Sequence, residues 1–242
     1  MGTFERPDES LDDAMHRTNQ IMAEAAKIAP GTQVVDLGSG YGATARYLAA
    51  EYGCTVTGIN ISPKENDFAD QRNREDGLEH LVTIAYGDFH DLPLPDASCD
   101  VVWSQEAMLH GADKTKILSE AHRVLRPGGT LVISDLLVHG NLDAAHRQQI
   151  YDRVRSPGMW DFQQYTEAIA GVGFELVRSE HWTETVAPTY ANVRAQIIDQ
   201  RTTLAEHVPP EQIDKTIDAL QLWVDGGNAE QVTHGFFVGT KQ

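Results

Sequence analysis

The feature that most constrains this chain is the stretch from Val34 to Gly42, which reads Val-Val-Asp-Leu-Gly-Ser-Gly-Tyr-Gly. An apolar run ends in the acid Asp36, a glycine-rich turn follows, and residues 43–50 then have the composition of a helix start. A strand, a glycine turn and a helix form the first half of a nucleotide-binding βαβ unit. Glycine lets the backbone turn sharply and lets a ligand approach closely, and the amides at the helix start face that ligand.

The spacing of the glycines separates this motif from the dinucleotide-binding type. That fingerprint reads G-x-G-x-x-G and carries an acid about 20 residues later. Here the glycines stand at 38, 40 and 42, the acid Asp36 precedes them, and Asn60 occupies the end of the next apolar run. For the turn taken alone, a tight turn without a ligand is the alternative interpretation.

Apolar runs and helical stretches alternate along the rest of the chain. Residues 1–10 look unstructured, and a helix is expected from Ser10, which can cap it, with a buried stripe of Leu11, Met15, Ile21, Met22 and Ala25. Strands are expected at 33–37, 55–60, 82–86, 99–104, 130–135, 174–178 and 231–240. Helices are expected after Ser62 to about residue 75, at 113–125 and within 189–225, and the segment 126–129, Arg-Pro-Gly-Gly, is expected to separate a helix from a strand.

Strands that alternate with helices predict a parallel sheet. In an open parallel sheet the ligand binds beyond the carboxyl ends of the strands. Five polar residues are expected at those ends: Asp36, Asn60, Asp88, Gln105 and Asp135. Chance turn chemistry hardly explains five such positions, so the pattern predicts one ligand site at this edge of the sheet.

Composition limits the partners of the protein. The net charge of −17 argues against nucleic acid and anionic membranes, since both require basic patches, and it fits simple solubility or a salt-adapted host. No run reaches the roughly 18 apolar residues of a membrane span. Residues 1–8 lack the features of a signal peptide, so a cytoplasmic location is expected. Cys54 and Cys99 lie in apolar runs and are expected to be reduced core thiols.

An ordered series of motifs resembles the class I S-adenosylmethionine-dependent methyltransferases. The series comprises Asp36-Leu37-Gly38-Ser39-Gly40, Gly87-Asp88-Phe89, Leu92-Pro93-Leu94-Pro95-Asp96, Asp100-Val101-Val102-Trp103-Ser104 and Leu125-Arg126-Pro127-Gly128-Gly129. Within that class the chain resembles the sarcosine/dimethylglycine N-methyltransferases of glycine betaine synthesis. That likeness rests on residues 103–110, Trp-Ser-Gln-Glu-Ala-Met-Leu-His, and on 222–227, Leu-Trp-Val-Asp-Gly-Gly. Two departures are an aromatic-rich segment upstream of Gly2 in that family and Glu106 where an aspartate is expected.

The resemblance implies an α/β fold of the Rossmann-like class I methyltransferase type. Its sheet would be seven-stranded and mostly parallel, with an antiparallel last strand, and a small helical cap would cover it. Residues 1–242 would form a single methyltransferase domain. Its core would comprise about 11–135, 166–188 and 228–242, and the cap segments would be about 136–165 and 189–227.

The cofactor that the resemblance implies is S-adenosylmethionine, with S-adenosylhomocysteine as product. Asp36 would meet the ammonium of its amino-acid tail, Asn60 the ribose hydroxyls and Asp88 the adenine amine. Binding over a helix-cap role is preferred for Asn60, because Ser62 is itself a capable cap. The residues expected to contact the cofactor are Asp36, Gly38, Ser39, Gly40, Gly42, Asn60, Ile61, Asp88, Phe89, Ser104 and Gln105.

The implied reaction is methyl transfer to a small molecule, foremost N-methylation of an amine such as sarcosine or dimethylglycine. Three alternatives stay open: O- or C-methylation of a natural product or quinone-like substrate, a non-methylating enzyme such as a cyclase that retains the fold, and a non-catalytic binder of the cofactor. No metal is expected, because the sulfonium already leaves easily and the ten histidines form no ligand pattern. A homodimer is also left open.

Catalysis would consist mainly of holding the nucleophile in line and removing its water. A secondary amine must arrive neutral, so His110 is a candidate base, with a satisfied surface histidine as the alternative. Gln105 and Glu106 complete the catalytic candidates. The residues expected to contact substrate are Gln105, His110, Asp135, His139, Arg153, Arg155 and Trp160. Of these, Arg153 or Arg155 would grip a substrate carboxylate, pairing with surface acids being the alternative. Trp103 is expected to pack inside the sheet.

Overall fold

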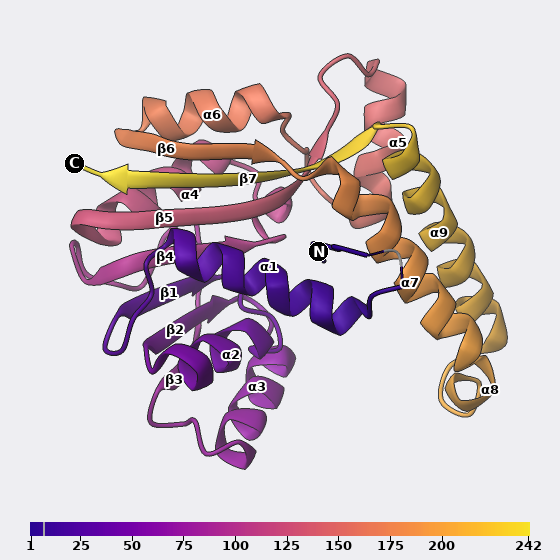
Figure 1. The fold of residues 1–242 in the computed structure, drawn as a ribbon, viewed down its shortest axis with the longest axis horizontal. Coiled ribbons are helices and arrows are strands. Elements are labelled where there is room, and N and C mark those ends of the chain that lie inside the picture. Colours follow the sequence, from indigo (N-terminus) through magenta and orange to yellow (C-terminus); the bar gives the residue numbers. More distant parts are fainter. Residues whose placement is uncertain (7) are drawn as a thin grey trace.

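The computed structural model, which describes residues 1–6 and 8–242, contains a seven-stranded sheet in the order β3-β2-β1-β4-β5-β7-β6 (Figure 1). The strands are β1 Gln33–Leu37, β2 Thr55–Asn60, β3 Val82–Tyr86, β4 Cys99–Gln105, β5 Leu125–Val138, β6 Phe174–His181 and β7 Val232–Lys241. Strands β1 to β5 run parallel, and β7 runs antiparallel between β5 and β6. The predicted Rossmann-like sheet with an antiparallel last strand is therefore confirmed.

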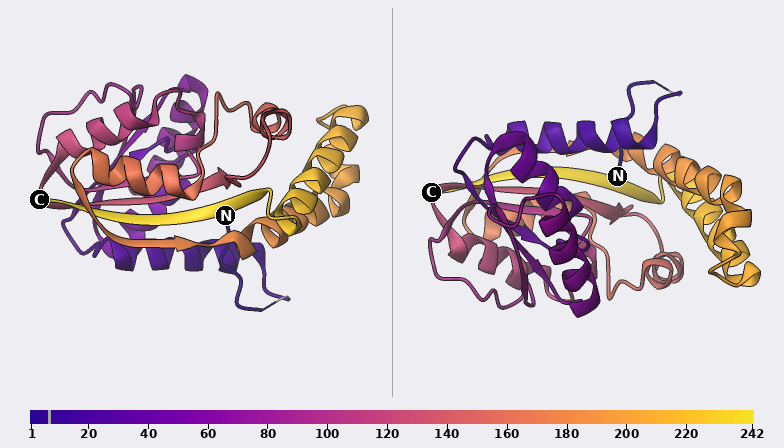
Figure 2. Two further views of the ribbon diagram at one scale, coloured as in Figure 1. Left: turned by 90° about the horizontal axis from the view of Figure 1, so that it is seen from above. Right: turned by 90° about the horizontal axis from the view of Figure 1, so that it is seen from below.

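Helices cover both faces of the sheet (Figure 2). The α-helices are α1 Leu11–Ala25, α2 Ala43–Tyr52, α3 Pro63–Glu75, α4 Lys114–Val124, α5 Ala144–Val154, α6 Phe162–Gly171, α7 Val186–Asp199, α8 Arg201–Leu204 and α9 Pro210–Asn228. Two 3-10 turns, η1 Met108–His110 and η2 Thr183–Thr185, follow β4 and β6. On one face, residues of α1 and α2 pack on alternate strand residues such as Val34 and Trp103. On the other face, α4 and α6 pack on Val35 and Val102. This alternation arises because successive side chains of a strand point to opposite faces.

The local signals for the first helices act as expected. The Ser10 side chain accepts a hydrogen bond from the Asp13 amide, and Ser62 accepts one from the Glu65 amide, so serine caps α1 and α3. The buried stripe of α1 differs from the prediction, because Met15 is 40% exposed. The helix buries Ala14 and Thr18 instead, which follow the buried Leu11 at spacings of three and four residues. Trp103, Cys54 and Cys99 are fully enclosed, as expected.

Strand β5 is longer than predicted at both ends. The segment 126–129 does not separate a helix from a strand but lies within β5, where a register shift between Cys99 and Val101 of β4 accommodates it. At the other end β5 continues beyond Asp135 to Val138, because it pairs with β7 from Val232 to Gly235. Asp135 therefore lies inside the strand, and its predicted place at the edge of the sheet is wrong.

The first residues and the cap segments share a hydrophobic cluster. Residues 1–4 form no helix or strand, but Met1 is only 8% exposed and packs with Leu109, Val186 and Trp223. The expectation of an unstructured start is therefore wrong for Met1. Pro7, within that predicted unstructured start, lies outside the described residues. The cluster joins α5, α7 and α9, and Figure 1 shows α7 and α9 side by side next to the N-terminus. The cap is thus tied to the end of β5 through Leu136 and Val138.

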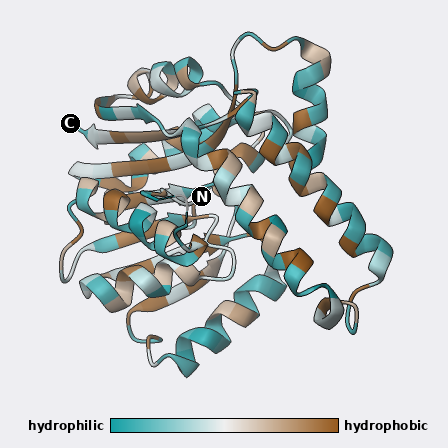
Figure 3. Ribbon diagram, turned by 45° about the vertical axis from the view of Figure 1, so that its right-hand side comes forward, coloured by the Kyte–Doolittle hydropathy of each residue, from teal (hydrophilic) through white to brown (hydrophobic). Residues whose placement is uncertain are grey.

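The distribution of hydrophobic residues follows these layers. Figure 3 shows hydrophobic stretches along the strands and an almost wholly hydrophilic α3. Helix α3 accordingly buries only Asn66, Ala69 and Asn73. In the part of the chain that the structure describes, no helix combines the length and hydrophobicity that crossing a bilayer requires.

Candidate active site

Two adjoining hollows open at the carboxyl edge of the parallel strands and share Gly38 and Glu106. The β2–β3 hollow, of about 550 Å³, is lined by Gly38, Gly40, Ile59, Asn60, Ile61, Glu65, Gly87, Asp88, Phe89, His90, Glu106, Ala107, His110 and Ala112. The α1 hollow, of about 430 Å³, is lined by Asp12, Met15, His16, Asn19, Asp36, Gly38, Ser39, Tyr41, Ala43, Thr44, Tyr47, Gln105 and Glu106. Together they form one elongated cleft at the edge where open α/β sheets bind ligands.

The glycine turn after β1 forms the floor between the two hollows. Gly38 has a φ of +77°, and a Cβ there would lie 2.5 Å from the Cβ of Ala107, so this position requires glycine. A Cβ on Gly40 would meet no atom within 4 Å, so the turn leaves free space there. Gly42 does not line the cleft as predicted. Its missing Cβ faces Ala69, so it serves the packing of α3.

Asp36 is the buried acid of the α1 hollow. It is 3% exposed, and its Oδ2 has no hydrogen-bond partner among the described residues. Burial raises the pKa of this carboxyl to about 7. The hydroxyl of Ser39 in the same hollow is also buried without a partner among them. Buried polar groups almost always have a hydrogen-bond partner, so one without a partner indicates a place for a ligand. The ammonium of an amino-acid tail is a ligand that would form this bond with Asp36.

Asn60 and Glu65 form a linked pair in the β2–β3 hollow. The Asn60 Nδ2 donates to Glu65 Oε2 at 3.0 Å and to Asn66 Oδ1 at 2.9 Å, which leaves the Asn60 Oδ1 to accept. Two neighbouring acceptor groups suit a vicinal pair of hydroxyls such as those of a ribose. Sequence reasoning missed Glu65. Its signal was an acid in the first turn of the helix that Ser62 caps.

Asp88 and Ile61 line the far end of the same hollow. The Asp88 Oδ1 accepts a hydrogen bond from the His90 amide at 2.9 Å and contacts His90 Nδ1 at 2.6 Å. The hydrogen bond from the His90 amide lowers the pKa of Asp88, so its carboxylate is anionic at neutral pH. Ile61 is 61% exposed and gives this end an apolar wall, with Phe89 nearby. An acceptor beside apolar walls suits a planar base that carries an amine.

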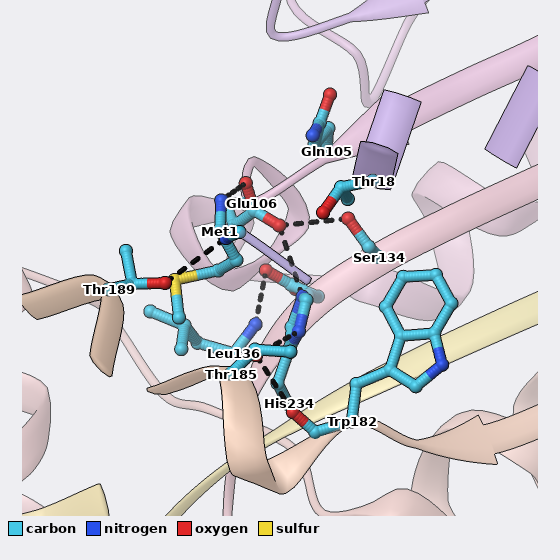
Figure 4. A network of polar contacts seen from close by, with 12 residues as sticks. Met1, Thr18, Gln105, Glu106, Ser134, Leu136, Trp182, Thr185, Thr189 and His234 are labelled. Carbon is cyan, nitrogen blue, oxygen red and sulfur yellow. Dashed lines mark hydrogen bonds and ion pairs between the residues drawn. The ribbon is translucent and has the colours of Figure 1, made fainter. Parts of the chain in front are cut away.

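Glu106 stands where the two hollows meet, and it carries the densest polar network of the cleft (Figure 4). Its Oε1 accepts from Ser134 Oγ at 2.8 Å and lies 3.1 Å from His234 Nε2. Its Oε2 accepts from the Met1 ammonium at 2.9 Å. Burial acts to raise the pKa of Glu106, but the ammonium and His234 outweigh burial and lower it to about 2. The carboxylate is therefore an anion that holds a cationic amine.

The backbone of Glu106 is unusual as well. Its φ is +49°, in the left-handed region that non-glycine residues rarely adopt, and its amide donates to the Ser134 carbonyl at 2.9 Å. Such conformations cost about 1–3 kcal/mol and cluster at functional sites. Here the conformation directs the side chain into the junction of the hollows.

His110 and Gln105 are the other catalytic candidates that the structure brings to the cleft. His110 lines the β2–β3 hollow, and partial burial together with the nearby charge of Lys114 lowers its pKa. Its imidazole is therefore neutral at neutral pH and able to accept a proton. Gln105 lines the α1 hollow, where its Oε1 accepts from Thr44 Oγ1 at 3.3 Å.

Three candidates, Ser104, Asp135 and Trp160, do not line the cleft. Ser104 is fully buried in β4 and lines neither hollow. The Asp135 Oδ2 accepts a hydrogen bond from Tyr165, and burial raises the pKa of this carboxyl to about 7. Trp160 packs its ring 5.2 Å from that of Tyr165 and 5.7 Å from Lys114 Nζ. The structure therefore does not place these three residues where they would contact a ligand in the cleft.

The cationic candidates of the cap are also elsewhere. His139 is exposed and lines a separate hollow with His181 and Thr233. Arg153 reaches the Leu222 carbonyl of α9 at 3.4 Å, and Arg155 is exposed at the end of α5. Neither arginine lines the cleft, and the residues that do line it include no lysine or arginine. The interpretation that these arginines lie on a solvated helix fits their positions better than a substrate anchor.

Comparisons with known proteins agree with this architecture. A methyltransferase-domain family model matches residues 35–133. The sarcosine/dimethylglycine N-methyltransferase of Halorhodospira halochloris is 35% identical over 98% of this chain and 85% of its own length. The dimethylglycine N-methyltransferase of Parasynechococcus marenigrum is 34% identical over 97% of this chain and 84% of its own length.

Solved structures extend these likenesses to three dimensions. A Galdieria sulphuraria protein proposed to be a sarcosine dimethylglycine methyltransferase superimposes with a TM-score of 0.93 at 29% identity, covering 100% of this chain and 92% of that one. The [4+2]-cyclase SpnF superimposes with a TM-score of 0.86 at 22% identity, covering 99% of this chain and 86% of that one. The second likeness shows the fold alone, since one fold supports different reactions.

Proposed function

This chain belongs to the S-adenosylmethionine-dependent sarcosine/dimethylglycine N-methyltransferase family, and from that membership we propose that it methylates the nitrogen of sarcosine or dimethylglycine, as its named relatives do. The protein is a methyltransferase that uses S-adenosylmethionine and acts on a small molecule. The observation that carries the choice of an amine is Glu106, whose carboxylate already holds an ammonium group at the junction of the two hollows.

The cleft fits the cofactor residue by residue. S-adenosylmethionine supplies an electrophilic methyl group on a sulfonium. Asp36 would hold the ammonium of the amino-acid tail, with Gly38 and Gly40 leaving it room. Asn60 and Glu65 would accept from the ribose hydroxyls, and Asp88 from the adenine amine. The orphaned carboxylate of Asp36 supports this assignment most directly, since it has no other partner among the described residues.

Glu106 would bind the amine substrate beside the reacting methyl group. In this structure the Met1 ammonium lies 2.9 Å from Oε2, and the substrate amine would take over this contact. An anion at this place favours a cationic amine over a phenol or a quinone, because it compensates the charge in a site with little water. His110, with its lowered pKa, would accept the N–H proton of the bound ammonium form, so that the neutral nitrogen attacks the methyl group as the bond from carbon to sulfur breaks. Glu106 would then compensate the positive charge that returns to the nitrogen.

A methyl-transfer assay tests this function. The protein would be incubated with labelled S-adenosylmethionine and, in separate reactions, with glycine, sarcosine, dimethylglycine, a phenol and a quinone. We expect labelled product from sarcosine or dimethylglycine, identified by mass as the amine with one more methyl group. If the phenol or the quinone were labelled and all three glycine derivatives stayed unmodified, the proposed N-methylation would be wrong. The protein would then be an O- or C-methyltransferase.

Asp88→Ala is expected to weaken binding of S-adenosylhomocysteine by about 1–3 kcal/mol, the cost of losing one hydrogen bond to a charged acceptor. The loss should be smaller for an analogue without the adenine amine, because that analogue never makes the bond. Calorimetry with both ligands measures the difference. Equal discrimination by wild type and variant would remove Asp88 as the adenine contact.

Glu65→Ala is expected to weaken the same ligand about 10-fold, because a carboxylate that accepts from a ribose hydroxyl is lost and Asn60 loses the partner of its amide. Glu65→Gln should be milder, since its amide oxygen can still accept. Lys64→Ala, at an exposed neighbouring position of α3, is the control. A 2′,3′-dideoxy analogue should bind wild type and Glu65→Ala equally well, and a persistent difference would count against the ribose contact.

The remaining attributes follow from composition and from the family. We expect a cytoplasmic enzyme that binds no nucleic acid, consistent with the net charge of −17. Residues 1–242 would act as one methyltransferase domain, with the segments 136–165 and 189–227 as a cap that excludes water. Sedimentation analysis would decide whether the chain forms the homodimer that the sequence leaves open.

A further inference from the structure

The network around Glu106 contains a buried histidine that the proposed reaction does not use. His234 lies in β7, 128 residues from Glu106 along the chain, and its side chain is fully buried. Its Nε2 lies 3.1 Å from Glu106 Oε1, and its Nδ1 lies 2.9 Å from Thr185 Oγ1. Figure 4 shows the imidazole between these two side chains.

The hydrogen-bond inventory fixes the proton on one nitrogen of His234. Glu106 is an anion, so its Oε1 can only accept, and Nε2 must carry a proton to bond with it. The Thr185 hydroxyl has one proton and two acceptors within reach, the Trp182 carbonyl at 2.7 Å and His234 Nδ1 at 2.9 Å. Whichever acceptor it serves, Nε2 remains the donor toward Glu106.

The two oxygens of Glu106 are therefore divided between two tasks. Oε1 is held by Ser134 Oγ and His234 Nε2, while Oε2 accepts only from the Met1 ammonium among the described residues. Two donors on one oxygen stop the carboxylate from rotating and stabilise its charge. The other oxygen is left fixed and anionic, and in this structure it faces the Met1 ammonium.

We propose that His234 is a positioning residue for the methyl acceptor: with Ser134 it holds Oε1 of Glu106, so that Oε2 presents a fixed single-oxygen acceptor to the cationic nitrogen of the substrate. This inference rests on the proposed function for the identity of the substrate. It explains why a histidine occupies a fully buried position in β7, opposite Leu136 of β5. Thr185, at the start of the cap helices, orients the ring from the other side.

Two isosteric substitutions separate positioning from packing. The amide nitrogen of glutamine lies near the position of Nε2 of histidine, and that of asparagine lies near Nδ1. His234→Gln therefore keeps a donor to Glu106, while His234→Asn keeps only the contact to Thr185. We expect KM for the amine to change less than about 3-fold in His234→Gln and to rise roughly 10- to 100-fold in His234→Asn, the range for losing a hydrogen bond to a charged group.

Controls distinguish this effect from a loss of folding. Affinity for S-adenosylhomocysteine should stay unchanged in both variants, and His80→Gln, at an exposed position, should match wild type in every assay. Ser134→Ala removes the other donor to Oε1 with little change of volume and should also raise KM. Equal KM values for His234→Gln and His234→Asn, or a wild-type KM in Ser134→Ala, would overturn the proposal.

A second readout needs no substrate and so separates this proposal from the proposed function. Loss of the Nε2 donor should raise the pKa of the Glu106 carboxyl in His234→Asn but not in His234→Gln, measured by carbon-13 NMR and assigned with Glu106→Gln. The other charged or titratable groups near this network are the Met1 ammonium, Asp135, Glu184 and Tyr190, and all are retained in both variants. Failure of wild type to methylate any glycine derivative would end the substrate assignment alone. Identical titrations in the two variants would end the positioning role.

Discussion

Asp36→Ala is expected to weaken binding of S-adenosylhomocysteine at least about 100-fold, the largest effect of any single substitution in the cleft, because it removes the buried anion that would hold the ligand's ammonium. A factor of 100 corresponds to about 2.7 kcal/mol. The fold should remain intact, since Asp36 Oδ2 has no partner among the described residues that its loss would leave unsatisfied. Calorimetry gives the affinity, and thermal unfolding without ligand gives the stability.

The same residue predicts the pH dependence of cofactor binding. Burial raises the pKa of Asp36 to about 7, so the Asp36 carboxyl of the unliganded protein is partly protonated at neutral pH. An ammonium binds the anion, so affinity should rise about tenfold per pH unit up to pH 7 and level off above it. In Asp36→Asn this rise should vanish, while Asp218→Ala, on the exposed face of α9, should keep it. A pH-independent affinity in wild type would contradict the assignment of Asp36 to the ammonium.

Glu106→Gln is expected to lower kcat/KM for the amine about 100-fold, mainly through KM, while affinity for S-adenosylhomocysteine changes less than about 3-fold. Glutamine keeps the shape of the side chain but removes the charge that compensates the cationic amine. Steady-state kinetics with dimethylglycine, or with sarcosine, and calorimetry with S-adenosylhomocysteine separate the two effects.

Glu106→Asp is the matched control. It retains the charge, and aspartate tolerates the left-handed backbone at this position better than most residues. Its shorter side chain should move the carboxylate away from His234, so an intermediate KM is expected. If Glu106→Gln lowered only the melting temperature and left KM unchanged, Glu106 would be a structural anion and the amine would bind elsewhere.

The first strands and helices could be predicted because their signals are local, whereas the architecture of the whole sheet was implied by the family resemblance. The glycine turn, the serine caps and the alternation of apolar runs with polar helices depend on neighbouring residues, and β1, β2, β3 and α3 begin and end where the sequence indicates. The end of β5 could not be predicted in this way. Its last three residues, 136–138, are strand because β7, about 100 residues later, pairs with them. That long-range pairing is what turned Asp135 into an interior residue.

The same difference between local signals and long-range contacts explains which parts of the candidate site could be predicted. Asp36, Asn60, Asp88 and Gln105 line the cleft because each lies at or just after the end of a parallel strand. The substrate side depends on how the cap folds back, and composition alone directed attention to Arg153 and Arg155, which face elsewhere. The pairing of β5 with β7 also determines where His234 lies, which no spacing in the sequence could reveal.

The position of β7 has a consequence for how the sheet is completed. Its residues, 232–241, come after those of every other strand in the sequence, yet they fill the gap between β5 and β6. Before β7 pairs with it, β5 has a long unpaired edge of Leu, Val and Ile residues, and such an edge promotes aggregation. The same strand brings His234 to Glu106. A chain without residues 230–241 would therefore lose the strand that joins β6 to the rest of the sheet, and it would also lose the histidine that holds Glu106. Such a chain is expected to aggregate rather than to retain part of its activity.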